Sequence, residues 1–195
     1  DDDCIVGKDY IKNNLDFILE NKCDVVTGPQ ISLSKIKFNK VFERNFHHKK
    51  KIKWASTNNV FFKKKIIKND MIFSNYVTKY GFGEDQLFFS KLTQKQFSIR
   101  WNKFNYVYEQ KNKNREKIKW FLKRNLNYGL TGILIDISLY GKFNGIIVNF
   151  LKSFYNFALF FIYLFLIPFN LKINLYFSLS FILRGLGRTL GIFKI

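Results

Sequence analysis

Apolar positions recur every three or four residues between Asp9 and Glu20, which predicts a helix whose apolar side carries Ile11, Leu15, Ile18 and Leu19. Residues 24–28, with Val25 and Val26 at their centre, then predict a short buried strand that ends at Gly28-Pro29. A second helical run follows Gly83-Glu84-Asp85. Strand character occurs within 54–62, 97–101 and 106–108, whereas 30–53 has the composition of a surface loop. Because helices and strands alternate, an α/β fold is expected.

The last third of the chain has a different pattern. Residues 153–171 contain no charged residue over 19 positions, about the ~20 needed to cross a bilayer core, so this stretch is a transmembrane candidate. A shorter apolar run, 173–183, continues into Arg184 and Arg188 and predicts an interfacial helix over about 173–193. The alternative is a pair of buried core helices in a soluble domain. We therefore expect two regions, 1–130 and 131–195.

Charge follows the same division. The chain has 33 Lys and Arg against 14 Asp and Glu, but 130–195 contains six basic residues and a single acid, Asp136. The high apolar content excludes a disordered basic tail. Cys4 and Cys23 are the only cysteines, which excludes a disulfide scaffold and favours reduced thiols.

The chain opens on three carboxylates, Asp1-Asp2-Asp3, without a signal sequence, which we interpret as the start of a fragment. Adjacent carboxylates repel one another unless they are solvated or share a cation. A hard divalent ion such as Mg²⁺ or Mn²⁺ is the cation that such oxygen ligands prefer. A solvated acidic surface is the alternative.

A second acidic pair, Glu84-Asp85, follows Gly81 and Gly83. Glycines ahead of a carboxylate pair let backbone approach a ligand closely, and the start of a helix favours negative charge. An ordinary helix N-terminus with acidic residues in its first turn is the alternative interpretation.

The order of these motifs is more specific than any one of them. Together the segments resemble the C-terminal half of family 2 glycosyltransferases with the GT-A fold. The resemblance covers about residues 1–130, includes the basic-aromatic stretch 115–124, and extends to the apolar tail of bacterial members that build surface polysaccharides. The segments that carry it are Asp1-Asp2-Asp3, Val26-Thr27-Gly28-Pro29, residues 55–60, Gly83-Glu84-Asp85 and Val107-Tyr108-Glu109.

The resemblance implies a metal site and a catalytic base. Asp1 and Asp3 would bind Mn²⁺ or Mg²⁺ and the diphosphate of a nucleoside-diphosphate sugar donor, with Asp3 the closer ligand. Asp85 would act as the general base of an inverting reaction, and Glu84 would orient the acceptor. A substrate pocket would be lined by Gly28, Thr57, Asn58 and Asn59, and Trp101 would stack on sugar unless it serves only in packing.

The implied activity is transfer of a sugar to a lipid-linked or glycan acceptor at the cytoplasmic face of the bacterial inner membrane. Two family features are missing from the sequence: the β/α half that binds the nucleotide, and the Gln-x-x-Arg-Trp signature of processive synthases. Their absence favours transfer of a single sugar and an incomplete GT-A domain.

Two other functions are compatible with the composition. Cations interleaved with aromatics at 49–53 and 111–124 would suit a nucleic-acid-binding protein, but no helix-turn-helix, zinc-finger or RNP-like motif accompanies them. Basic residues before an apolar tail fit an anionic membrane surface better, so we expect no nucleic-acid partner. A non-catalytic, basic, membrane-anchored protein is the other alternative. His47-His48 is expected to be solvated surface.

Overall fold

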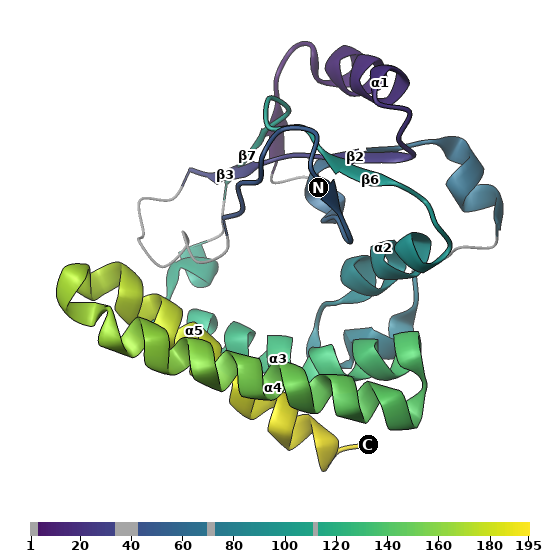
Figure 1. Cartoon of the computed structure of the whole chain (residues 1–195). Coiled ribbons are helices and arrows are strands. Elements are labelled where there is room, and N and C mark those ends of the chain that lie inside the picture. The colour runs from purple at the N-terminus through teal and green to yellow at the C-terminus, as the bar shows by residue number, and fades with distance from the viewer. Residues whose placement is uncertain (1–3, 34–42, 70–72, 111–112) are drawn as a thin grey trace. The chain divides into compact units, whose positions relative to one another are not determined.

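The protein has a mixed α/β fold (Figure 1). The computed structural model describes residues 4–33, 43–69, 73–110 and 113–195. The chain divides into two compact units. The sheet unit comprises residues 1–35, 43–74 and 85–111, and the helical unit comprises 36–42, 75–84 and 112–195.

Two small sheets form the framework of the sheet unit. One has the strand order β1-β7-β3 and the other β4-β6-β2-β5. In the second sheet β2 runs parallel to β6, with Val25 opposite Ile99 and Thr27 opposite Trp101. The strands are β1 (Cys4–Val6), β2 (Val25–Thr27), β3 (Gln30–Ser32), β4 (Lys51–Ile52), β5 (Val60–Phe62), β6 (Ile99–Trp101) and β7 (Val107–Glu109).

Helices cover both faces of the four-stranded sheet because successive side chains of a strand point to opposite faces. Val25 packs with Phe88, Phe89 and Leu92 of α2 (Glu84–Gln94). Val26 packs instead with Phe17 and Ile18 of α1 (Tyr10–Glu20). The strand β2 is therefore the centre of a helix–sheet–helix arrangement.

Helix α1 lies where the periodicity predicts it, but it buries a different face. Its buried residues are Asn14, Phe17 and Ile18, whereas Ile11 and Leu19 are 69% and 64% exposed. Of the expected apolar side, Ile18 is buried, and the expectation was wrong for Ile11, Leu15 and Leu19. The polar Asn14 is buried because it finds a hydrogen-bond partner inside the unit.

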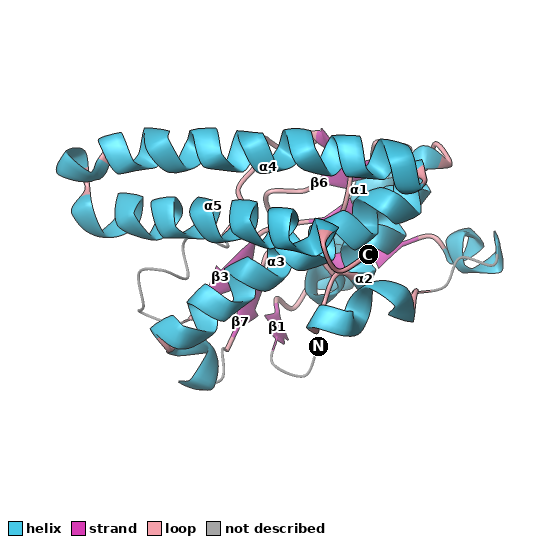
Figure 2. Cartoon of the chain, turned by 90° about the horizontal axis from the view of Figure 1, so that it is seen from below, coloured by secondary structure: helices cyan, strands magenta, loops and turns pink. Residues whose placement is uncertain are grey.

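The helical unit contains α3 (Ile118–Tyr140), α4 (Lys142–Phe165) and α5 (Leu171–Ile192). Figure 2 shows α4 and α5 side by side, and their contacts prove them antiparallel: Asn149 bonds to Arg188, whereas Tyr163 stacks on Phe177. Short 3₁₀ helices complete the described chain at Thr57–Asn59, Lys64–Asn69, Asn75–Tyr80, Lys113–Glu116 and Ile167–Phe169.

The expected transmembrane segment 153–171 is not one continuous helix. α4 ends at Phe165, and a 3₁₀ turn containing Pro168 separates it from α5. Proline at the start of a new turn leaves no backbone N–H to continue the preceding helix. Among the described residues, one helix, Lys142–Phe165, is long and apolar enough to cross a membrane. The helix α3 also runs through residue 130 without a break.

Helices α4 and α5 bury polar and small residues and expose large apolar ones, whereas α3 buries large apolar residues such as Phe121 and Ile133. The exposed fraction reaches 77% for Phe143, 70% for Phe154 and 80% for Phe165. Small interior side chains and an apolar exterior are typical of helices packed in a lipid environment. The buried residues of α4 and α5 are Gly145, Asn149, Ser153, Ser178, Ser180, Gly185, Gly187 and Gly191.

Candidate functional site

The candidate site lies where the parallel strands β2 and β6 end. Gly28-Pro29 follows β2 directly, and residues 102–105 follow β6. Ligands of open α/β sheets bind beyond the carboxyl ends of parallel strands, so these two loops are the first place to look for a site.

Gly28 brings the two loops into direct contact. A Cβ atom at this position would lie 2.0 Å from the carbonyl oxygen of Asn105 and 2.8 Å from that of Asn102. Both distances are far below van der Waals contact with backbone atoms that cannot easily move. Only glycine fits at this position. The loop after β6 therefore covers Gly28, which was expected to line a pocket.

Asn59 ties three segments of the sheet unit together. Its fully buried amide nitrogen donates to the carbonyl oxygens of Pro29 and Asn105, at 2.9 Å each. Its amide oxygen accepts a hydrogen bond from the Tyr10 hydroxyl at 2.8 Å. The Thr27 hydroxyl donates to the Asn59 carbonyl at 2.5 Å. Every polar atom of this side chain thus holds the framework of the site.

Asn58 and Thr57 occupy more open positions. The amide oxygen of Asn58 accepts hydrogen bonds from the Gln30 side chain and from the Ser56 hydroxyl, and Asn58 is partly exposed. Thr57 is exposed. The structure therefore brings Gly28, Asn58 and Asn59 together, and it leaves Thr57 and Asn58 accessible to a ligand.

Tyr10, Asn14 and Asn105 belong to this cluster but were not identified from the sequence. The Asn105 amide donates to Asn14 Oδ1 at 2.5 Å in the interior. Burial raises the pKa of the Tyr10 hydroxyl, although hydrogen bonds with Asn14 and Asn105 act in the opposite direction. The phenol consequently stays protonated and able to donate to Asn59. A signal was present in the sequence, since Asn14 is one turn from both Tyr10 and Phe17 on a helix.

Trp101 packs inside the sheet unit. It is 5% exposed, and its ring meets Phe46 edge-on with 5.1 Å between centroids. Its indole nitrogen is buried without a hydrogen-bond partner in the described part of the chain. A sugar could stack on the ring only if it were uncovered, so the geometry favours the packing role.

Glu84 and Asp85 form the first turn of α2, as the motif predicts. The backbone N–H of Gln86 donates to the Asp85 carboxylate at 2.6 Å. One oxygen of Glu84, Oε2, is buried and has no partner among the described residues. The preceding Gly83 has φ of +117°, a backbone conformation that favours glycine. The start of α2 therefore determines where the two carboxylates lie. The hydrogen bonds around Asn59 involve neither of them.

Asp1 and Asp3, the expected metal ligands, lie outside the described residues. Within residues 4–33, 43–69, 73–110 and 113–195, no group of three His, Cys, Asp or Glu side chains could hold a metal ion.

The two histidines differ in their surroundings. His47 is exposed, but His48 is half-buried between the rings of Phe17 and Phe104, with centroids 5.4 and 4.8 Å away. Burial lowers the pKa of the His48 imidazole, and the cations Lys49 and Lys103 lower it further. The expectation of solvated surface was wrong for His48, which packs as a neutral aromatic ring.

Comparison with known proteins adds no assignment. No protein-family model matches the chain, and no curated protein sequence matches it.

Proposed function

We propose that this chain is part of a family 2 glycosyltransferase with a GT-A fold, which transfers a sugar from a nucleoside diphosphate to a lipid-linked or glycan hydroxyl. The observation that carries the proposal is the convergence of Gly28 with Asn58 and Asn59 at the end of β2. The family pattern puts the same segments in one substrate pocket. Helices on both faces of the sheet around β2 suit a Rossmann-like domain.

In this proposal Asp85 is the general base. The hydrogen bond from the Gln86 N–H orients its carboxylate at the start of α2. As the acceptor oxygen forms its bond to the anomeric carbon, that carboxylate takes the hydroxyl proton, and the bond to the diphosphate oxygen breaks on the opposite face. Glu84, with a buried oxygen available for a hydrogen bond, orients the acceptor.

Asp1 and Asp3 would hold Mn²⁺ or Mg²⁺ against the donor diphosphate. When bound, such an ion neutralises the charge that develops on the departing nucleoside diphosphate. The described residues contribute the framework instead: Asn59 fixes the loop after β2, and Thr57 and Asn58 face the space where a sugar would bind.

We further propose that the helical unit associates with the cytoplasmic face of the bacterial inner membrane. Support comes from the exposed phenylalanines of α4 and from the polar and small residues that α4 and α5 bury, because apolar side chains need not be buried in a lipid environment. The excess of basic residues in the same unit suits an anionic cytoplasmic leaflet.

The test is a transfer assay on the protein encoded by the intact native gene, in isolated membranes, with labelled sugar nucleotides and Mn²⁺. Label should appear in the lipid or glycan fraction, and Asp85→Asn should abolish it while donor binding persists. Asp16→Asn is the matched control, because Asp16 is an exposed carboxylate on α1. Near-normal turnover of the Asp85→Asn enzyme would overturn the base assignment.

A non-catalytic, membrane-anchored protein is the second candidate. This alternative is favoured by the hydrogen bonds of Asn59 and Asn105. Their side-chain amides donate to oxygen atoms of the protein itself, as in a purely structural cluster. Membrane association without transfer from any of the sugar nucleotides would establish this alternative.

A further inference from the structure

Helices α3, α4 and α5 carry an excess of positive charge. From Ile118 to the end, the sequence has nine Lys and Arg and one acidic residue, Asp136. Asp136 is 1% exposed and already accepts bonds from Lys152 at 2.5 Å and Arg188 at 2.8 Å.

Arg184 is a cation that contacts neutral side chains. It is partly buried on α5, directly after the uncharged run 173–183. Its Nε donates to the amide oxygen of Asn125 at 2.9 Å, and its guanidinium lies 5.1 Å from the ring centroid of Tyr128. No carboxylate pairs with it in the described part of the chain, and Asp136, the acid of α3 to α5, pairs with Arg188 and Lys152.

Asn125 fixes the position of this arginine. Its amide oxygen also accepts a hydrogen bond from the Ser180 hydroxyl at 2.6 Å, and its nitrogen donates to the Phe121 carbonyl at 2.9 Å. The amide is fully buried, so its orientation is determined by these partners. The guanidinium is therefore held in place by α3 before any ligand arrives.

A second guanidinium shares the same aromatic ring. Arg124 on α3 lies 5.2 Å from the Tyr128 centroid, and its Nε donates to the Tyr128 hydroxyl at 3.3 Å. It also lies 4.9 Å from the ring of Phe82 and 5.0 Å from that of Trp120. Two like charges beside one ring repel each other, and an anion between or above them would relieve that repulsion.

We propose that Arg124 and Arg184, which both lie beside the ring of Tyr128, bind the phosphate of an anionic lipid headgroup. Guanidinium groups match phosphate oxygens through paired N–H donors, which suits this chemistry better than a point charge. A lipid is the source we favour because large apolar side chains such as Phe154 and Phe165 are exposed on the same unit and can receive acyl chains. The proposal rests on membrane association, and it does not depend on sugar transfer.

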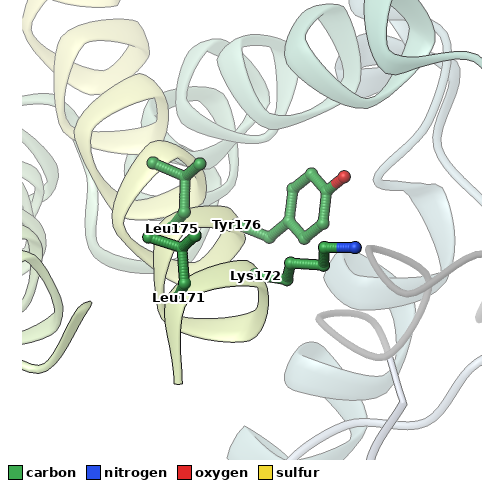
Figure 3. A pocket seen from close by; sticks show the side chains of 4 residues that line it. All are labelled: Leu171, Lys172, Leu175 and Tyr176. Atoms are coloured by element: carbon green, nitrogen blue, oxygen red, sulfur yellow. The ribbon is translucent and has the colours of Figure 1, made fainter. Parts of the chain in front are cut away.

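The chain offers a matched control at the other end of α5. Lys172 is exposed, and Figure 3 shows it beside Tyr176 on one side of the helix, with Leu171 and Leu175 on the other. These four residues line a shallow hollow. Lys172→Gln thus removes one positive charge from the same helix beside an aromatic ring but away from Arg184.

The experiment measures phosphatidylglycerol bound to the purified full chain in neutral detergent by native mass spectrometry. Arg184→Gln and Arg124→Gln should each weaken binding about tenfold, the effect of losing one charge-assisted hydrogen bond. Lys172→Gln should leave it unchanged. Arg184→Lys, which keeps the charge and lacks the planar fork, should fall between; circular dichroism confirms that each variant is folded.

Five outcomes are decisive. Equal binding by the wild type and both arginine variants would overturn the site, and so would an equal loss in Lys172→Gln, which indicates diffuse surface charge. Inorganic phosphate that binds as tightly as the lipid would overturn the lipid source. A chain that associates with no vesicle, whether of phosphatidylcholine alone or mixed with phosphatidylglycerol, would refute both this site and the membrane proposal. Absent sugar transfer with intact lipid binding would refute only the catalytic proposal.

Discussion

Gly129 of α3 and Gly187 of α5 bring two helix backbones into direct contact. A Cβ atom on Gly187 would lie 2.2 Å from the carbonyl oxygen of Leu126 and 2.9 Å from the Cα atom of Gly129. A side chain at either position would push the helices apart. Close crossing at small residues is the geometry that gives apolar helices their packing energy in a lipid environment.

Replacing Gly187 should therefore destabilise the helical unit. We expect Gly187→Val to lower its free energy of unfolding by about 3 kcal/mol or more, because overpacking against backbone cannot be relieved by a rotamer change. Thermal unfolding in neutral detergent measures the effect. Gly7→Ala is the control, since nothing lies within 4 Å of a Cβ at Gly7. An equal melting temperature for wild type and Gly187→Val would contradict the crossing.

The ion pairs of Asp136 yield a second prediction. Asp136→Asn leaves Arg188, whose side chain is 12% exposed, without its carboxylate, and we expect a loss of about 3 kcal/mol in stability. Lys152→Met should cost less than about 1 kcal/mol, because the Lys152 side chain is 45% exposed. Urea unfolding of both variants measures the difference. Equal losses would show that burial does not set the strength of these pairs.

Asn59 should be more important for stability than its neighbours in the same motif. Asn59→Leu leaves the carbonyl oxygens of Pro29 and Asn105 without this donor in the interior, at a cost of about 2 to 3 kcal/mol. Thr57→Ala, at an exposed position, should change stability by less than about 0.5 kcal/mol. Chemical denaturation followed by tryptophan fluorescence distinguishes them. A neutral Asn59→Leu would refute the framework role of this amide.

Acid should destabilise the sheet unit through Asp24. Burial alone would raise the pKa of this carboxyl, but hydrogen bonds from Lys65 and Ser98 outweigh it and hold the pKa below its ordinary value. The native state then binds fewer protons than the unfolded state. The stabilisation is present above the unfolded pKa of about 4 and is lost as the pH falls through the lower native pKa.

The measurement is the pH dependence of unfolding with Asp24→Asn. This variant should lose stability at neutral pH and show a flatter decline between about pH 4 and pH 2 than the wild type does. Asp16→Asn, an exposed carboxylate on α1, serves for comparison. Parallel declines for wild type and Asp24→Asn would contradict the lowered pKa.

Local pattern predicted several elements, but not what they bury. The expectation of a surface loop over 30–53 was wrong at both ends, where β3 and β4 pair with strands far along the chain. The helix at Tyr10–Glu20, the strand at Val25–Thr27 and the helix after Gly83 all lie where periodicity and Gly-Pro signals place them. The buried face of α1 was missed because it depends on Asn105, 91 residues away, which gives Asn14 its partner. The sequence of one or two helical turns does not show which distant residue will contact Asn14.

The start of α4 was missed for a similar reason. Lys152 interrupts the apolar run, so the expected segment began at 153, yet this lysine pairs with Asp136 on α3 and is compatible with the middle of a helix. The end was misplaced because the turn around Pro168 separates two helices without placing any charged residue in the run. In the candidate site, Gly28 and Asn59 could be singled out as motif residues, whereas their bonds to the β6 loop required the fold.

The antiparallel arrangement of α4 and α5 has a topological consequence. Residues just before Lys142 and just after Ile192 lie at the same end of this helix pair, as the bond between Asn149 and Arg188 near that end requires. A chain that enters a bilayer through such a pair leaves it on the side from which it came. A reporter fused after Ile195 would then share its compartment with Gly141.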